Sequence, residues 1–292
     1  MSRPPSPGFT SYLPSSLAAA STSWADVDAA STPGFDGDKS AGKSLMSARG
    51  DVLSELQERL YAGGKSGRTE SVLLVLQGMD TSGKGGMVRN VLGMVEPQGV
   101  DHATFGSPTK EELEHPFLWR VEKKLPRPGQ IGVFDRSHYE DVLIVRVKNL
   151  VPPSVWRTRY DEINEFERRV VDSGTRVIKV AMALSYAEQG RRLARRLRRP
   201  DKYWKYDPSD IEAREQWLSY QEAYQAMLDR TDTEWAPWYV VPSDHKWYSR
   251  LAVTELLTGA LESLDLTWPP PNFDVDHEKR RLEELETPPG ID

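Results

Sequence analysis

Buried strands that alternate with amphipathic helices are the first prediction from the pattern of hydrophobic and polar positions. Short aliphatic runs bounded by turn residues occur at 71–77 ("SVLLVLQ"), 131–135 ("IGVFD"), 176–184 ("RVIKVAMAL") and 238–241 ("WYVV"). Such runs are typical of parallel strands buried on both faces. Helical periodicity begins at Leu45 and ends at "YAGGKSG", and it recurs over roughly 154–172, 209–229 and 246–264. A further helix should begin at Thr109, where Glu112 completes a capping-box spacing. The alternation predicts an α/β fold with a parallel sheet.

Both ends of the chain lack this pattern. Residues 1–30 are rich in Ser, Pro, Ala and Thr, and such a segment buries too little surface to offset its ordering entropy. We therefore expect a disordered or extended N-terminal tail. After Trp268, the stretch "PPPNF" and a charged segment predict a loosely packed C-terminal tail over 267–292. One domain, residues 31–266, remains between the two tails.

Composition narrows the function classes. The chain of 292 residues carries a formal charge of −6, from 38 Lys and Arg against 44 Asp and Glu, which argues against indiscriminate binding to nucleic acid or to a membrane. The absence of cysteine excludes disulfides and thiolate sites and fits a cytoplasmic location. No apolar run approaches the roughly 18–20 residues that span a bilayer. We predict a cytoplasmic protein with neither a nucleic acid nor a membrane as partner.

Two stretches match the P-loop pattern G-x-x-x-x-G-K-[ST] to different degrees. The first match, "GDKSAGKS" (37–44), fits every position. A P-loop works because a strand leads into a glycine turn whose backbone N–H groups face a phosphate, and a helix N-terminus follows. The first match follows "STPGFD", which contains no strand signal. We interpret it as the polar start of a helix.

The second match, "QGMDTSGKGG" (77–86), follows the strongest strand signal and precedes "MVRNVLGMV", a plausible helix. We predict that this loop binds phosphate. The predicted phosphate-binding residues of the loop are Gly78, Thr81, Ser82, Gly83, Lys84, Gly85 and Gly86. Gly85 replaces the Ser or Thr that usually ligates Mg²⁺, whereas Asp80 supplies a carboxylate that can reach the metal or a water on it. The alternative for Asp80 is a turn-stabilising Asx residue.

A second acidic centre lies in "IGVFDRSHYEDVL" (131–143). A strand that ends in Asp135 is a Walker-B arrangement, which would place this carboxylate at the sheet edge near the P-loop, and Arg136 adds an anion-binding group. We interpret His138, Tyr139, Glu140 and Asp141 mostly as helix-start residues. Asp244 and Lys246, just past another predicted strand, are further site candidates.

An arginine run occupies "EQGRRLARRLRRPDKYWKY" (188–206). Six arginines fall within 191–199 without an acidic residue among them, whereas a solvated charge run normally contains interleaved carboxylates. On a helix, Arg192, Arg196 and Arg199 share one face, and Arg191, Arg195 and Arg198 share another. The run predicts a lid that closes over an anionic ligand. Six arginines exceed the need of one triphosphate, and a polyanionic chain or RNA would explain the surplus.

Together these pieces resemble the polyphosphate kinase type 2 family. The matching motifs are "TPGFDGDK", "LQERLYA", "VLQGMDTSGKGG", "FDRSHYEDVL", "RRPDKYWKYDPSD" and "EWAPWYVVPSDHKWY", which cover roughly 32–260. The resemblance implies a thymidylate-kinase-like P-loop fold, a three-layer sandwich with a parallel sheet and an arginine-rich helical lid over about 187–208. It also implies Mg²⁺-dependent, reversible phosphoryl transfer between inorganic polyphosphate and nucleotides, by a homo-oligomer.

Site residues follow from the resemblance motif by motif. It implies that the catalytic residues are Asp80, Lys84, Asp135, Arg136, Arg192 and Arg196. From the chemistry of the residues themselves, we expect Asp80 and Asp135 to hold the metal, and Arg191, Arg195, Arg199 and Lys205 to bind further phosphates. The "RSHYEDVL" form resembles the branch that acts on nucleoside mono- and diphosphates, here AMP and ADP, with guanine nucleotides as an alternative. Members of that branch often carry Asn at the position of Asp135.

Two other functions fit parts of the same pattern. An ATP-dependent nucleotide or nucleoside kinase would share the fold and the loop, but would be indifferent to polyphosphate. A nucleotide-gated RNA-binding module would use the arginine run to bind backbone phosphates. The run, however, lacks the interleaved stacking aromatics that single-strand binders favour.

Overall fold

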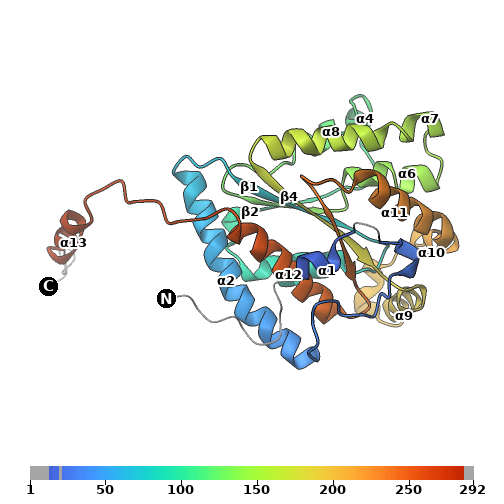
Figure 1. Cartoon of the computed structure of the whole chain (residues 1–292), viewed down its shortest axis with the longest axis horizontal. Coiled ribbons are helices and arrows are strands. Elements are labelled where there is room, and N and C mark those ends of the chain that lie inside the picture. The colour runs from blue at the N-terminus through green and yellow to red at the C-terminus, as the bar shows by residue number, and fades with distance from the viewer. Residues whose placement is uncertain (1–12, 20–21, 286–292) are drawn as a thin grey trace.

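A five-stranded parallel sheet forms the centre of the computed structural model, which describes residues 13–19 and 22–285 (Figure 1). The strands are β1 (Ser71–Gln77), β2 (Val100–Thr104), β3 (Ile131–Asp135), β4 (Thr175–Ala183) and β5 (Trp238–Pro242). Their order is β2-β3-β1-β4-β5, and every neighbouring pair is parallel. The four predicted strands are confirmed, and the α/β class with them.

Strand β2 was missed by the hydrophobic pattern. Its sequence, "VDHAT", has no aliphatic run, and its residues are half-buried or exposed. The strand lies at the edge of the sheet and pairs only with β3, from Val100 opposite Ile131 to Thr104 opposite Asp135. An edge strand can form from a polar sequence because half of its surface faces solvent.

Helices cover both faces of the sheet. They are α1 (Leu13–Leu17), α2 (Lys39–Lys65), α3 (Lys84–Val91), α4 (Lys110–Leu113), α5 (Trp119–Glu122), α6 (Ile144–Val147), α7 (Pro153–Trp156), α8 (Arg159–Asp172), α9 (Tyr186–Leu197), α10 (Ser209–Glu215), α11 (Trp217–Thr231), α12 (Lys246–Glu262) and α13 (Val275–Glu283). The predicted helices over 154–172 and 209–229 are each divided into two. None of the described helices combines the length and the apolar character needed to cross a bilayer.

Alternation along the central strand creates two hydrophobic cores. Leu73 and Val75 of β1 pack with α8 and α11, whereas Val72, Leu74 and Leu76 pack with α2, α3 and α12. Successive side chains of a strand point to opposite faces, so a strand that is buried throughout supplies both cores. The result is the predicted three-layer sandwich (Figure 1).

The first P-loop match lies in the opening turns of α2, which begins at Lys39 rather than Leu45. Asp38 is the N-cap, and its side chain accepts a hydrogen bond of 2.8 Å from the Ala41 N–H. A Cβ atom on Gly42 would lie 2.5 Å from the Trp247 ring of α12. This glycine therefore permits close helix packing. The predicted polar helix start is confirmed.

The N-terminal segment is more ordered than predicted. Leu17, Ala19 and Trp24 are buried, and the Trp24 ring stacks on Tyr224 with centroids 4.9 Å apart. Composition misses such a segment because single anchoring side chains, separated by Ser and Ala, are enough to fix it. Residues 1–12 and 20–21 of the predicted tail lie outside the described residues.

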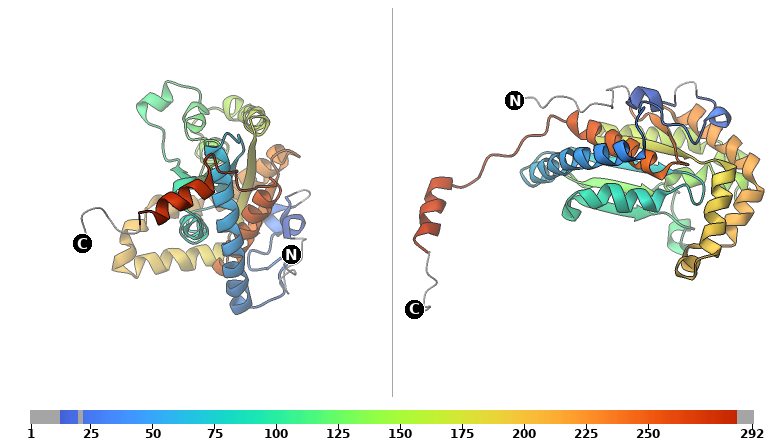
Figure 2. Two further views of the ribbon diagram at one scale, coloured as in Figure 1. Left: turned by 90° about the vertical axis from the view of Figure 1, so that its left-hand side faces the viewer. Right: turned by 90° about the horizontal axis from the view of Figure 1, so that it is seen from below.

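Helix α13 lies away from the body of the molecule (Figure 2). None of its residues is buried. Residues 286–292 lie outside the described part of the chain.

Candidate active site

A cavity of about 840 Å³ lies where the carboxyl ends of β1 and β3 meet α9. In open parallel sheets, ligands bind at this edge, where the strand order reverses. Its cationic lining side chains are Lys84, Arg89, Arg136, Arg192, Arg195, Arg196, Arg199, Lys202, Lys205, Lys246 and Arg250, and its carboxylates are Asp80 and Asp135. Eleven cations against two carboxylates, in a chain of net charge −6, make the cavity a site for a polyanion.

The second P-loop match forms the floor of this cavity. The chain leaves β1, turns through Thr81 and Gly83 with positive φ values of 69° and 120°, and enters α3 at Lys84. The buried Lys84 ammonium donates to the carbonyls of Gly78 (2.5 Å) and Met79 (3.5 Å). The loop thus folds around its lysine, with the N-terminus of α3 directed toward the cavity, as a phosphate-binding loop requires.

The predicted phosphate-binding residues of the loop divide into two groups. Thr81, Gly83, Lys84, Gly85 and Gly86 line the cavity. Gly78 and Ser82 do not line the cavity. They pack against each other inside the loop: a Cβ atom on Gly78 would be 2.6 Å from the Ser82 hydroxyl, and Ser82 is almost completely buried. These two residues support the loop from below.

Asp80 and Arg136 form an ion pair across the loop. Arg136 Nη2 lies 2.8 Å from Asp80 Oδ1. Burial by itself would raise the pKa of the Asp80 carboxyl, but the charges of Lys84 and Arg136 outweigh burial and hold this pKa below its ordinary value. The carboxylate is therefore ionised at neutral pH.

Arg136 has a strained backbone, with φ at 64°. Burial would lower the pKa of its guanidinium, yet the charges of Glu140 and Asp80 raise it. Backbone strain of this kind persists only where the surrounding structure fixes the residue, and it is concentrated at functional sites.

Asp135 ends β3 beside the start of α3. A Cβ atom built on Gly85 would lie 4.0 Å from Asp135 Oδ2. The carboxylate thus faces the position where other P-loops carry the metal-binding hydroxyl. The missing side chain at Gly85 leaves room for a ligand next to Asp135.

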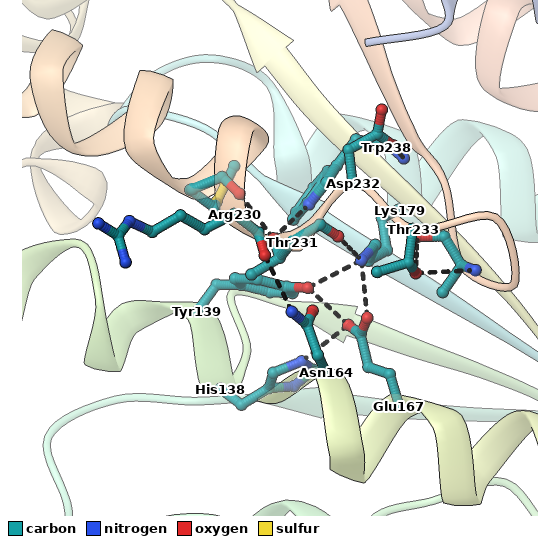
Figure 3. A network of polar contacts seen from close by, with 12 residues as sticks. His138, Tyr139, Asn164, Glu167, Lys179, Arg230, Thr231, Asp232, Thr233 and Trp238 are labelled. Atoms are coloured by element: carbon teal, nitrogen blue, oxygen red, sulfur yellow. Dashed lines mark hydrogen bonds and ion pairs between the residues drawn. The ribbon is translucent and has the colours of Figure 1, made fainter. Parts of the chain in front are cut away.

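The turn after Arg136 is anchored by a buried polar network (Figure 3). The predicted helix start at 138–141 is confirmed as a short 3₁₀ turn. Glu167 of α8 lies 3.1 Å from His138 Nε2 and accepts a hydrogen bond of 2.7 Å from the Tyr139 hydroxyl. The Lys179 ammonium, fully buried in β4, donates to Glu167 (2.7 Å), Tyr139 (2.9 Å) and the Thr231 carbonyl (2.6 Å).

Charge is balanced within this network. Burial would raise the pKa of Glu167, but Lys179 offsets burial and lowers it. The network fixes the segment that immediately follows Arg136. A lysine inside the aliphatic run "RVIKVAMAL" was a signal for it, because a buried charge requires a partner.

Glu140 is a site residue that the sequence interpretation did not single out. Burial raises the pKa of its carboxyl, although Arg136 and Lys84 oppose this shift. When the Gln77 amide is oriented so that its nitrogen donates to Glu140 Oε1 (3.1 Å), its oxygen accepts from the Ser137 N–H (3.0 Å). Glu140 therefore acts as a third acidic group behind the Asp80–Arg136 pair.

The segment predicted as a lid, about 187–208, forms α9 and a 3₁₀ helix over Pro200–Lys205, and it ends just before α10. Arg192 differs from the neighbouring arginines because its side chain is buried. Its five N–H groups all donate hydrogen bonds to other groups of the protein. They donate to the carbonyls of Thr81 (2.8 Å), Ser82 (2.9 Å), Ser243 (2.6 Å) and Asp244 (2.9 Å), and to Glu188 (2.8 Å). Its contact with phosphate stays a prediction.

The other lid cations divide between the cavity and the outer surface. Arg195, Arg196, Arg199 and Lys205 line the cavity, together with Lys202, which was not predicted. Arg196 also donates to the Lys205 carbonyl (2.8 Å) and to Asp210 (3.0 Å). Arg191 lies outside the cavity lining, mostly exposed, and pairs with Glu188 at 2.8 Å.

Of the two candidates after β5, Lys246 faces the cavity. Asp244 instead accepts hydrogen bonds from the Ser185 N–H (2.9 Å) and hydroxyl (2.6 Å), and Ser185 is the N-cap of α9. Burial, together with the nearby charges of Arg192 and Arg195, lowers the pKa of Lys246 to about 8. Arg250, one helical turn after Lys246, also lines the cavity, and the spacing of four residues could have identified it.

A magnesium ion fits the two carboxylates. The described residues contain no group of three His, Cys, Asp or Glu side chains that would hold a metal without help. Mg²⁺ is usually bound by one or two carboxylates plus substrate phosphates and water. Asp80, ionised by its cationic neighbours, and Asp135, beside the open position at Gly85, supply the hard oxygen ligands that this arrangement requires.

Known proteins are similar to this chain in sequence and in fold. Residues 37–267 match the family model described as "Polyphosphate kinase 2 (PPK2)". The chain is 47% identical over 240 residues to an "AMP/ADP-polyphosphate phosphotransferase" of Meiothermus ruber, covering 82% of this chain and 88% of the relative. It is 40% identical over 237 residues to an "ADP-polyphosphate phosphotransferase" of Rhodopseudomonas palustris, covering 77% and 81%.

A solved structure is similar over nearly the whole chain. The crystal structure of polyphosphate kinase 2 from Arthrobacter aurescens superimposes with a TM-score of 0.92 at 46% sequence identity, covering 96% of this chain and 99% of that one.

Proposed function

The chain belongs to the polyphosphate kinase 2 family, and on this premise we propose that it transfers phosphoryl groups reversibly between inorganic polyphosphate and adenine nucleotides. AMP and ADP are the acceptors. The names of the two relatives from Meiothermus ruber and Rhodopseudomonas palustris support this substrate class.

The observation that carries the proposal is the charge of the cavity. Eleven cations and two carboxylates line a space of about 840 Å³. A nucleotide needs the loop, Lys84 and a few further cations. The row of cations from α9 to Lys205 exceeds that need, and a chain of phosphates uses it. An ATP-dependent kinase leaves this surplus without a ligand.

The reaction is an in-line displacement between phosphates. An oxygen of the acceptor's terminal phosphate attacks the terminal phosphorus of polyphosphate. As the new P–O bond forms, the bridging P–O bond of the chain breaks, and the shortened polyphosphate leaves with that electron pair. Because the attacking and leaving groups are both ionised phosphates, the site needs no strong general base. One phosphoanhydride replaces another, so the reaction runs in both directions.

The residues of the cavity position the two substrates. Lys84 exchanges its bonds to loop carbonyls for nucleotide phosphate oxygens, which the N–H groups at the start of α3 also bind. Arg136, Arg196 and Arg199 hold the terminal phosphates of polyphosphate. Catalysis then rests on orientation and on fixed positive charge where negative charge develops.

Mg²⁺ is the proposed cofactor, held by Asp80 and Asp135. Bound there, the ion would supply positive charge that neutralises the phosphoryl oxygens.

A transfer assay tests the proposal. Purified protein receives Mg²⁺, long-chain polyphosphate and either AMP or ADP, and chromatography measures new ADP or ATP. We expect product that requires polyphosphate and is lost in Lys84→Ala. Transfer from ATP without any from polyphosphate would identify an ordinary nucleotide kinase instead. RNA binding with a steep salt dependence and no transfer would identify a binding module.

A further inference from the structure

A second cavity, of about 600 Å³, adjoins the first. Arg195, Lys246 and Arg250 line both cavities, so the two spaces lie next to each other along these three side chains. On its far side the second cavity is lined by Lys39 and Lys43 of α2. The proposed reaction gives these two lysines no role.

The cations of the second cavity have no partners in the part of the chain that the structure describes. Among the described residues, no hydrogen bond or ion pair involves the side chain of Lys39, Lys43, Arg195, Lys246 or Arg250. Two carboxylates also line the cavity, but both are already bonded elsewhere. Glu188 accepts from Arg191 and Arg192, and Asp244 accepts from Ser185. The positive charge of the cavity is therefore not neutralised from within.

Helix packing holds the two lysines at this position. Lys39 and Lys43 are four residues apart and share one face of α2. The first turns of α2 lie against the start of α12, where Gly42 allows the backbone to approach the Trp247 ring. Figure 1 shows the N-terminal ends of α2 and α12 beside each other, on the side of the molecule that carries α9. The approach that Gly42 permits brings the neighbouring Lys43 next to Lys246 and Arg250.

We propose that the second cavity is a subsite for the distal phosphates of a long polyphosphate chain, with Lys39 and Lys43 as residues that favour long chains over short ones. This inference rests on the proposed function. The terminal phosphates occupy the first cavity, the chain passes Arg195, Lys246 and Arg250, and its next phosphates lie between α2 and α12. Lys43, which stands at the lysine position of the first P-loop match, thus binds phosphate from the side of a helix, through its charge alone.

The subsite affects affinity and leaves the chemical step unchanged. Lys39 and Lys43 are exposed, and each exposed cation–phosphate contact contributes modestly and is screened by salt. A short chain that ends within the first cavity does not reach them. Burial and neighbouring positive charge lower the pKa of Lys246, and a polyanion lying between the two cavities relieves that repulsion.

The test compares Lys39→Gln/Lys43→Gln with a matched control, Lys65→Gln/Lys110→Gln, which removes the same charge from the far end of α2 and from α4. Binding of fluorescently labelled long-chain polyphosphate is measured by anisotropy, and binding of tripolyphosphate by competition. The KM for long-chain polyphosphate and kcat are measured at saturating ADP.

For the test variant we expect the Kd and KM for long-chain polyphosphate to rise roughly three- to tenfold. Its kcat, its affinity for tripolyphosphate and its KM for ADP should match the wild type, and the control should match the wild type throughout. Unchanged long-chain binding in the test variant, or equal losses for both chain lengths, would overturn the inference.

Failure of the proposed function gives a different result. A wild-type protein that binds long-chain polyphosphate through Lys39 and Lys43 but transfers nothing to AMP or ADP would retain the subsite and reject the reaction. A wild-type protein that transfers phosphate, with a test variant that keeps wild-type Kd and KM, would retain the reaction and reject the subsite.

Discussion

Asp80 combines an ionised carboxylate with a position inside the phosphate-binding loop. In Asp80→Asn we expect activity to fall roughly 100-fold or more, because a bound metal contributes several kcal/mol of charge stabilisation at the transition state. The fold should persist, as judged by circular dichroism and thermal unfolding. Steady-state rates at several Mg²⁺ concentrations provide the measurement.

A suitable control for this variant is Asp172→Asn, which also removes an aspartate paired with arginine, but on the exposed face of α8. It should keep wild-type activity. An active Asp80→Asn variant would exclude the metal role and favour the turn-stabilising interpretation.

Lys246 predicts a pH dependence of polyphosphate binding. Its pKa in the folded protein is about 8, below the ordinary lysine value near 10.4, so the free protein loses this cation as the pH rises through about 8. Affinity for polyphosphate should decline from there upward. Binding titrations at a series of pH values measure the decline. In Lys246→Arg the guanidinium stays charged, and affinity should hold to higher pH.

The lowered pKa of Lys246 also makes the stability of the fold depend on pH, in the opposite direction to the affinity for polyphosphate. Because the folded state binds this proton less tightly than the unfolded state, the contribution of Lys246 to stability rises as the pH increases from about 8 toward the unfolded value. Lys205→Arg is the matched control, since it makes the same substitution at another lysine that lines the cavity. If polyphosphate affinity depended on pH equally in Lys246→Arg and in the wild type, the role of the Lys246 charge in binding would be contradicted.

At the scale of elements, Arg192 joins α9 to the phosphate-binding loop and to the end of β5. In Arg192→Lys, one ammonium cannot reach all of the carbonyls that the guanidinium serves. Unsatisfied buried carbonyls should lower the free energy of unfolding by roughly 2–4 kcal/mol, measured by urea denaturation. Arg191→Lys, the exposed neighbour, should change stability little. A stable Arg192→Lys variant with reduced polyphosphate affinity would instead support direct phosphate contact.

The network around Lys179 joins β4, α8 and the turn that follows β3. Lys179→Met leaves the Glu167 carboxylate buried without its cation, and the free energy of unfolding should drop by about 3–5 kcal/mol. The double variant Lys179→Met/Glu167→Gln should recover part of this loss, because a neutral amide is easier to bury. Chemical denaturation of both variants measures the difference. Equal stability of the two variants would contradict the ion-pair assignment.

How far the sequence predicts each element depends on where its stabilisation originates. Strands β1, β3, β4 and β5 were predictable because aliphatic runs between turn residues report burial directly. Strand β2 was not, since its stability comes from pairing with β3. The loop with Lys84 was identified by its context of strand and helix. Glu140 was not singled out, because its role arises from Gln77 and Arg136, which only the folded sheet brings next to it.

At the scale of the whole molecule, none of the residues of helix α13 is buried. Removal of residues 270–292 should therefore leave the Tm of the body within about 2 °C of the wild type, measured by calorimetry. Transfer activity per chain should also be unchanged. Light scattering on the same pair of proteins reports whether α13 takes part in the homo-oligomer expected from the family. A large drop in Tm without a change in the number of chains per oligomer would show that the segment packs on its own chain.

The five hydrogen bonds of Arg192 also determine how the lid can move. Two of them attach the first half of α9 to the phosphate-binding loop, two attach it to Ser243 and Asp244 after β5, and the fifth lies within α9. Arg196 is bonded instead to Lys205 and Asp210, which belong to the outer part. We therefore predict that opening of the lid pivots within the short stretch between Arg192 and Pro200. On this prediction, the cations beyond the pivot move away from the cavity when the lid opens, and the phosphate-binding loop keeps the shape that Arg192 supports.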